Sequence, residues 1–190
     1  GELEWRRTLI APGGLAITPI FALRGDGHFV NLEGQSALLD AGTVTQAEAF
    51  RTMATAGIEL RWPILFSTTS ATHVLEPMAQ VFVRNNERLA GRLPNEDAQS
   101  FVFDASNLFE RDKFSGFDRM EGGVRANVGL RYSGTFSNGW SAHALFGQSY
   151  HLGGVNSFGL PDLVNVGAAS GLETNVSDYV GMFGVTYGAR

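Results

Sequence analysis

The densest group of charged residues in the chain is Asp118, Arg119, Glu121 and Arg125. Residues of opposite charge at such short spacing can form salt bridges that stiffen a structure, or they can contact a second protein. Arg125 and the nearby Arg131 could instead pair with phosphate groups, because a guanidinium matches the geometry of a phosphate. Structural salt bridges use the same residues, and they are the favoured interpretation.

A catalytic or metal site is not indicated by the sequence. Ser141 and His143 lie two positions apart, and a Ser–His pair can act as nucleophile and base when the two groups are within hydrogen-bond reach. No catalytic motif surrounds them, so polar residues on one face of a strand are the simpler interpretation. The other histidines, His28, His73 and His151, lack the spacing of metal ligands. We therefore expect no enzyme activity, no metal and no cofactor.

One acidic loop could bind a cation. Asn95-Glu96-Asp97, with Asp104 further along the chain, offers oxygen atoms to a divalent ion that bridges lipid phosphates. Acidic loops are more often simply solvated, and that interpretation is favoured here.

A strictly alternating stretch follows the charged group. From Val124 to Tyr132, apolar residues alternate with polar or small ones. A period of two predicts a strand, because successive side chains leave opposite faces of a pleat. An Asn-Gly pair at 138–139 is a strong hairpin signal, and a second alternating run begins at Trp140. The stretch therefore predicts an antiparallel hairpin with one apolar and one polar face.

Composition narrows the class of protein. Of the 190 residues, 44% are hydrophobic and 17% are charged, whereas soluble domains have roughly 25% charged residues. A net charge of −5 leaves no basic surplus to neutralise phosphates, so nucleic acid is not an expected partner. The chain has no Cys, which excludes disulfides and thiolate sites. No run approaches the ~18 apolar residues of a membrane helix, although strands that cross a bilayer need no such run.

Alternation extends over most of the chain. Pro19 lacks a ladder donor, so strand pairing is expected to weaken there. Short helical turns are expected within residues 43–50 and at Asn107–Lys113. Seven strands are predicted, at about residues 3–10, 15–24, 52–66, 73–85, 118–136, 140–150 and 178–187.

The connections between these strands are alternately short and long. In an up-and-down antiparallel sheet, alternate connections lie at the same end, so all the short turns are expected at one end and all the long loops at the other. This arrangement, with strands of about ten residues, is typical of outer-membrane β-barrels. The predicted fold class is all-β, an antiparallel up-and-down transmembrane β-barrel segment. Complete single-chain bacterial barrels have an even number of strands, so residues 1–190 are expected to form part of one larger barrel domain.

The two faces of the strands differ in chemistry. The apolar face carries mostly Ala, Val and Leu, with aromatic residues near strand ends as at membrane interfaces. We expect this face to contact lipid and the polar face to line the lumen. A charge at Val128 should therefore disrupt the barrel, whereas one at Asn127 should be mild. The residues predicted to face the lumen are Glu59, Arg61, Glu76, Gln80, Arg125, Asn127 and Arg131.

Two alternatives stay open at this point. A small complete barrel acting as a porin or adhesin would have the same alternation, and so would a soluble antiparallel ligand-binding barrel.

Three blocks of sequence resemble the LptD family, the lipopolysaccharide-assembly barrel also called the organic solvent tolerance protein. HVLEPMAQVFVRN is similar to the family's strand with a Glu-Pro step, here at 76–77, and FDASNLFERDKFSG to its loop with an Asp, here Asp104, followed by Leu-Phe at 108–109. The blocks follow in the family's order across roughly residues 60–148. The third block, FSGFDRMEGGVRANVGLRY, carries Phe114, Gly116, Asp118, Arg119, Gly122, Gly123, Arg125, Gly129, Leu130 and Tyr132.

The resemblance implies a barrel of 26 strands in the cell outer membrane, which inserts lipopolysaccharide into the outer leaflet. It also implies an N-terminal periplasmic lipid-binding domain and a plug lipoprotein, LptE. The expected partners are lipopolysaccharide, an LptE-like plug, outer-membrane lipid, and periplasmic bridge proteins reached through the N-terminal domain, which is expected outside this segment. The family's lateral gate, between first and last strands, is expected outside it too. The segment would act passively, as a polar-lined wall whose loops help to cap the lumen.

Overall fold

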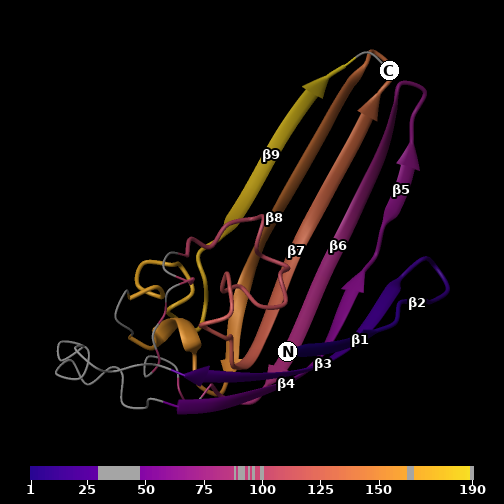
Figure 1. Cartoon of the computed structure of the whole chain (residues 1–190). Coiled ribbons are helices and arrows are strands. Elements are labelled where there is room, and N and C mark those ends of the chain that lie inside the picture. The colour runs from indigo at the N-terminus through magenta and orange to yellow at the C-terminus, as the bar shows by residue number, and fades with distance from the viewer. Residues whose placement is uncertain are drawn as a thin grey trace.

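The computed structural model describes residues 1–29, 48–87, 89, 93, 95, 97–98, 101–161 and 165–188. The described residues form one antiparallel sheet in the order β1-β3-β4-β6-β7-β8-β9, with β2 paired to β3 and β5 paired to β6 (Figure 1). This arrangement confirms the predicted all-β, antiparallel class, and the sheet is not closed, as expected for part of a barrel. The strands are β1 (Glu2–Arg6), β2 (Leu9–Ile10), β3 (Ala16–Phe29), β4 (Glu48–Arg61), β5 (Ile64–Ser67), β6 (Ala71–Arg84), β7 (Gly123–Phe136), β8 (Trp140–Gly153) and β9 (Val180–Tyr187), with one short 3-10 helix, η1 (Ser157–Gly159).

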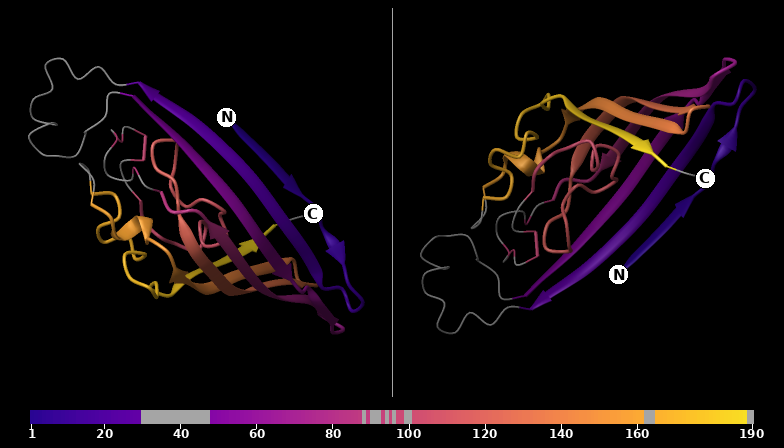
Figure 2. Two further views of the ribbon diagram at one scale, coloured as in Figure 1. Left: turned by 90° about the horizontal axis from the view of Figure 1, so that it is seen from below. Right: turned by 90° about the horizontal axis from the view of Figure 1, so that it is seen from above.

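Short turns and long connections lie at opposite ends of the sheet. β6 and β7 pair along their whole lengths, from Ala71 opposite Phe136 to Arg84 opposite Gly123. The turn from β7 to β8 occupies residues 137–139, where Gly139 has a φ of +87° and its amide donates to the carbonyl of Phe136 at 3.1 Å. The described parts of the connections at 85–122 and 154–179 gather at the other end, on the concave side of the curved sheet (Figure 2).

Two prolines mark where strand pairing is interrupted. The predicted strand at 52–66 is not continuous: β4 starts at Glu48 and ends at Arg61, and β5 resumes after Pro63 and pairs with β6. A proline cannot donate to a ladder, which accounts for the break. The predicted strand at 3–10 is divided into β1 and β2, and the gap between them falls opposite Pro19. On its other side Pro19 stays in register with Ile58 of β4.

Other predicted boundaries need correction. β3 continues to Phe29, beyond the predicted limit at residue 24, and β7 begins at Gly123 instead of residue 118. The helix predicted at Asn107–Lys113 is wrong, because residues 105–109 form turns only. Most of the helical turn predicted within 43–50 lies outside the described residues, and residues 48–50 belong to β4.

The exposed face of the sheet is the apolar one. Large side chains that alternate along the strands are exposed on it, among them Leu3, Trp5, Phe21, Leu23, Ile58, Val83, Val128, Leu130, Phe146, Phe183 and Val185. The opposite, concave face is covered by the long connections, and Gln80, Arg125, Asn127 and Ser149 are buried there. Water-soluble proteins rarely expose so large an apolar surface, so the soluble alternative fits the sheet poorly.

Aromatic side chains gather at the short-turn end of the exposed face. His73 stacks between Phe66 and Tyr132, with ring centroids 5.0 and 6.0 Å away, and its Nδ1 lies 2.8 Å from the Tyr132 hydroxyl. Trp140 packs against Tyr187 nearby. Amphipathic rings at this level are typical of a membrane interface.

The hydrophobic core lies between the concave face and the connections. The connections contribute most of its members, and β6, β8 and β9 contribute the rest. Among the described residues, no helix is long and apolar enough to span a membrane. The core consists of Met78, Ala98, Phe103, Ala105, Leu108, Phe114, Leu145, Phe158, Val166, Leu172 and Val180.

Candidate functional site

A band of hydrogen-bonded side chains crosses the concave face. Nε2 of Gln80 donates to Oε2 of Glu59 at 2.7 Å and to the carbonyl of Phe109 at 2.9 Å. Asn127 joins the band by donating to Oε1 of Gln80 at 3.1 Å. The hydroxyl of Ser149 donates to Oδ1 of Asn127 at 2.7 Å. The band therefore links β4, β6, β7 and β8 through side chains as well as through their backbone ladders.

A second group on the same face centres on Glu76. Its carboxylate accepts from Nε of Arg61 at 2.8 Å and from a terminal nitrogen of Arg131 at 3.2 Å. The two arginine side chains are 38% and 39% exposed, whereas that of Glu76 is 11% exposed. Two guanidinium groups share one carboxylate and remain partly accessible to solvent, and the carboxylate of Glu59 lies on the same face of β4, two positions from Arg61.

All seven residues predicted to face the lumen thus lie on one face and join one of these two groups. Arg125 belongs to the first, because it donates to the hydroxyl of Ser149 at 3.2 Å. Arg125 is also 1% exposed, so the loops have removed it from the free surface.

The loop-side end of this face holds a buried charge cluster. Glu121 pairs with Arg125 and lies 3.6 Å from a terminal nitrogen of Arg84. Burial alone would raise the pKa of Glu121, but Arg84, Lys113 and Arg125 outweigh it and lower the pKa to about 2. Burial raises the pKa of Asp112 to about 6, with a further contribution from the charge of Glu121. Glu121 therefore stays ionised near neutral pH as the anion that holds the arginines together.

Arg119 and Arg125 enclose an aromatic stack. The rings of Phe114 and Phe158 stack with centroids 4.3 Å apart and an interplanar angle of 16°. The guanidinium carbon of Arg119 lies 4.8 Å from the Phe114 centroid, and that of Arg125 lies 5.2 Å from the Phe158 centroid. Arg119 also donates to the carbonyl of Ser157 at 2.6 Å. Cation–π contacts of this kind are strongest when desolvated, so the stack fastens the connection before β7 to the connection after β8.

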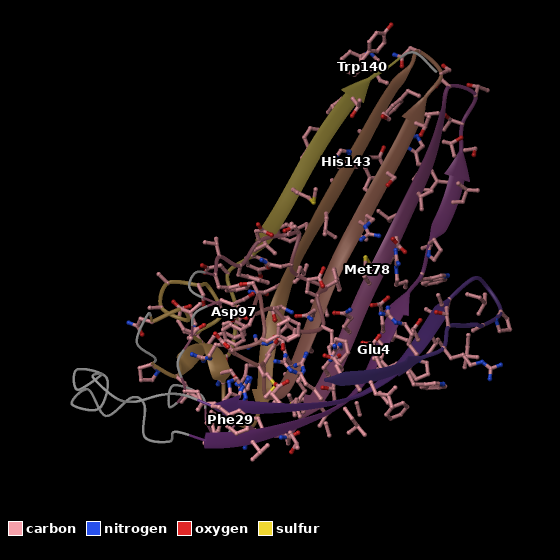
Figure 3. The ribbon with its side chains drawn as sticks, in the orientation of Figure 1. Glu4, Phe29, Met78, Asp97, Trp140 and His143 are labelled. Carbon is pink, nitrogen blue, oxygen red and sulfur yellow. The ribbon has the colours of Figure 1, made fainter. Side chains whose placement is uncertain are left out.

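Gly116 allows a reciprocal contact between two aspartates. The carboxylate of Asp97 accepts from the amides of Phe117 at 2.5 Å and Asp118 at 3.0 Å. The carboxylate of Asp118 accepts from the amide of Asp97 at 3.2 Å. Gly116 has a φ of +77°, and a Cβ there would overlap the Asp97 carboxylate, so a side chain is excluded on both grounds. Figure 3 shows Asp97 among the packed connections.

Gly122 and Gly123 lie where the connection enters β7. The amide of Gly122 donates to the hydroxyl of Ser157 at 2.9 Å. Gly123 has a φ of +76°, and a Cβ there would lie 2.6 Å from the carbonyl oxygen of Gly153. The two glycines therefore let the loop pass close to the end of β8.

Asp104 caps a turn. Its Oδ1 accepts from the amide of Ser106 at 2.7 Å and from its hydroxyl at 2.6 Å. Asp97 is used in the contacts around Gly116, and no group of three or more possible metal ligands occurs among the described residues.

The Ser141–His143 hypothesis gains no support from the geometry. His143 packs against Gly184 of β9, nearer the short-turn end than Asp97 (Figure 3). Within the described part of the chain, no hydrogen bond joins Ser141 to His143.

Two residues that join strands and connections at the loop-side end of the molecule were not predicted from the sequence. Arg51 donates to the carbonyls of Asp118 at 2.6 Å and Phe117 at 2.8 Å, and so joins β4 to the connection before β7. Asn85 lies where β6 ends, and its side chain binds the backbone of β4. Alternation extended to Glu48 would have placed Arg51 on the polar face, but no local pattern marks Asn85.

Comparison with models of known protein families gives a match over the whole chain. A family model described as LptD, LPS transport system D, matches residues 1–190, the whole chain. No curated protein matches the chain.

Proposed function

The chain belongs to the LptD family, which acts in lipopolysaccharide transport and assembly in the outer membrane, and on this premise we propose that it forms a section of the barrel wall of a lipopolysaccharide translocon. In this role the wall delivers lipopolysaccharide into the outer leaflet. The seven polar residues face the interior of the barrel, where the connections cover Arg125 and Asn127, and the apolar face contacts lipid.

The observation that carries the proposal is the inverted burial of the sheet. Val128 and Leu130 are exposed, while Asn127, between Arg125 and Gly129 on the other face, is fully buried. An apolar surface of this extent is stable in contact with acyl chains, and a polar interior is typical of outer-membrane barrels. The antiparallel ladders satisfy the backbone groups between the strands, as a bilayer requires.

The exposed guanidinium groups of Arg61 and Arg131 suit a phosphorylated cargo. They share Glu76 and remain partly exposed, so their outer N–H groups can pair with a phosphate, and charge-assisted pairs of this kind are strong. The same surface could contact a plug lipoprotein of the LptE type. Bridge proteins in the periplasm would supply the lipid, and the wall would guide it without chemical change.

Depletion of the full-length parent protein in its own cell tests the proposal. Newly made lipopolysaccharide should fail to reach the cell surface while its export from the inner membrane continues. Unchanged surface delivery would refute the translocon role, and solute uptake by a porin-type barrel would then be the function to measure.

A further inference from the structure

The connection before β7 contacts the two halves of the wall in different ways. On the side of β6, β8 and β9, its apolar side chains pack into the hydrophobic core. On the side of β1 and β3 the contacts are polar. Arg111 pairs with Glu2 and Glu4 of β1, and Arg24 of β3 donates to the carbonyl of Phe117 at 2.6 Å. The connection thus has an apolar side and a charged side.

A cavity of about 140 Å³ lies on the charged side, between the connection and strands β3, β4 and β6. A water molecule occupies about 30 Å³ in the liquid, so the cavity has room for several. Its lining includes Ala22 of β3, Met53 of β4 and Arg84 of β6, with Met120 and Glu121 from the connection.

Two polar atoms of this lining are buried without a hydrogen-bond partner. The side chains of Arg84 and Glu121 are 3% and 1% exposed. Among the described residues, no hydrogen bond reaches Nη1 of Arg84 or Oε2 of Glu121. A buried charged group that lacks part of its hydrogen bonding is unfavourable. A water molecule accepts from a guanidinium and donates to a carboxylate, so water in the cavity would serve both atoms.

A second cavity, of about 340 Å³, adjoins the first. The two share Arg111 and Asp112 in their linings. The second cavity is also lined by Arg6, whose side chain is 68% exposed, and by the exposed Glu110. It therefore opens to solvent on the concave face, and Asp112 lies between this opening and the first cavity.

We infer that the two cavities form a water-filled crevice under the connection before β7, which brings water from the lumen to Arg84 and Glu121. This water completes the hydrogen bonding of Nη1 and Oε2 and passes Asp112 on the way. The charge cluster that fastens the connection is therefore solvated from the lumen, although its side chains are almost completely buried. The inference concerns the folded wall and does not depend on what the barrel transports.

Radiolytic labelling of the folded full-length parent in lipid nanodiscs tests the crevice. Short X-ray pulses produce hydroxyl radicals from water, and these radicals oxidise methionine side chains beside that water. Met53 and Met120 line the first cavity and are 5% and 1% exposed, whereas Met78 belongs to the hydrophobic core and is 6% exposed. The three side chains are similarly buried, so their exposure does not account for a difference in rate. Mass spectrometry of the peptides measures each rate.

Met53 and Met120 should be oxidised several-fold faster than Met78. Rates no faster than that of Met78 would overturn the crevice. Equally fast oxidation of all three would also overturn it, because it would show that the whole connection opens and exposes the core. Failure of the crevice would leave the result of depletion untouched, so the two proposals are tested separately.

A variant that fills the cavity tests the same inference in a second way. Ala22→Val adds two methyl groups to the lining and should slow the oxidation of Met53 and Met120. Ala49→Val adds the same groups at another buried position of β4, outside this lining, and should leave both rates unchanged. Unchanged rates in a folded Ala22→Val protein would overturn the crevice. Heat-modifiable mobility on gels reports folding, and if Ala22→Val does not fold, the comparison of methionines in the unchanged protein decides.

Discussion

Asn127 on β7 donates to Gln80 on β6 over 3.1 Å, and both side chains are almost completely buried. Their neighbours in sequence, Val128 and Val81, point to the opposite face, where Val128 is 41% exposed. Polar side chains thus satisfy each other under the loops, while apolar ones face outward. The predictions that follow concern this inversion and the contacts that hold the loops on the concave face.

A charge on the exposed face should destabilise the folded wall. Val128→Arg in the full-length parent should reduce folding stability by about 2–4 kcal/mol if the residue lies near the bilayer midplane. The measurement is the fraction of folded barrel in lipid vesicles across a urea series.

Asn127→Arg is not a suitable control for the Val128→Arg substitution. The alternation alone made Asn127→Arg a mild substitution, but Asn127 is fully buried and hydrogen-bonded to Gln80 and Ser149, so this substitution is now expected to be destabilising. Ser133 lies on the same face of β7 and is exposed, so Ser133→Arg is the suitable control. Equal losses from Val128→Arg and Ser133→Arg would contradict a lipid-facing Val128.

A side chain at Gly116 should loosen the connection before β7. Gly116→Ala places a Cβ at a φ of +77° and against the Asp97 carboxylate, at a cost of about 1–3 kcal/mol. Limited proteolysis of the folded parent should cleave this loop faster. A Cβ at Gly153 would meet no atom within 4 Å, so Gly153→Ala should leave the cleavage rate unchanged. Equal rates for the two variants would show that Asp97 does not hold this turn.

Removal of the Asn85 carboxamide should loosen β4 beyond the end of its ladder with β6, which lies at Thr55 opposite Arg84. Asn85→Ala leaves the Ala54 amide and the Thr52 carbonyl without their side-chain partner, and each of these exposed hydrogen bonds contributes about 0.5–1.5 kcal/mol. Hydrogen exchange should accelerate at the backbone amide of Ala54. It should stay unchanged at the amide of Leu60, which pairs with Ala79 in the continuous part of the β4–β6 ladder. Unchanged exchange at Ala54 would contradict the role of Asn85.

The stability of the connection before β7 should depend on pH through the carboxyl group of Asp112. The folded protein raises the pKa of this carboxyl from 3.8 to about 6, so the folded state holds a proton that the unfolded chain has released. The stability that this proton binding contributes is present below pH 3.8 and is lost as the pH rises through about 6. Asp112→Asn should abolish this loss and make the loop more resistant to proteolysis at pH 7 than in the unchanged protein.

Asp104 provides a control of opposite sign. Hydrogen bonds from Ser106 lower the pKa of Asp104, so its stabilisation is present at neutral pH and is lost as the pH falls. Asp104→Asn should therefore weaken the loop at pH 7. A stabilising Asp104→Asn, or a destabilising Asp112→Asn, would contradict these assignments.

Local patterns in the sequence account for much of the sheet. The alternation from Val124 to Tyr132 placed β7 and its two faces, and Pro63 could have indicated the break between β4 and β5. The fold of the connections could not be predicted in this way, because their contacts join distant parts of the chain. Arg51 reaches Phe117 and Asp118, and no spacing rule connects these positions. The motif shared with the family marked Gly116, Gly122 and Gly123 but gave no physical reason for them.

Labelling with a membrane-impermeant maleimide tests the orientation of the wall most directly. The segment has no Cys, so Val128→Cys and Ser133→Cys can each introduce one thiol into a parent from which any other reactive Cys has been removed. The vesicles of outer membrane are opened so that the reagent reaches both sides of the membrane, and Ser133→Cys should then be labelled. Val128→Cys should be protected until denaturant has displaced the lipid. Rapid labelling at Val128 with protection at Ser133 would contradict a polar lumen behind an apolar, lipid-facing surface.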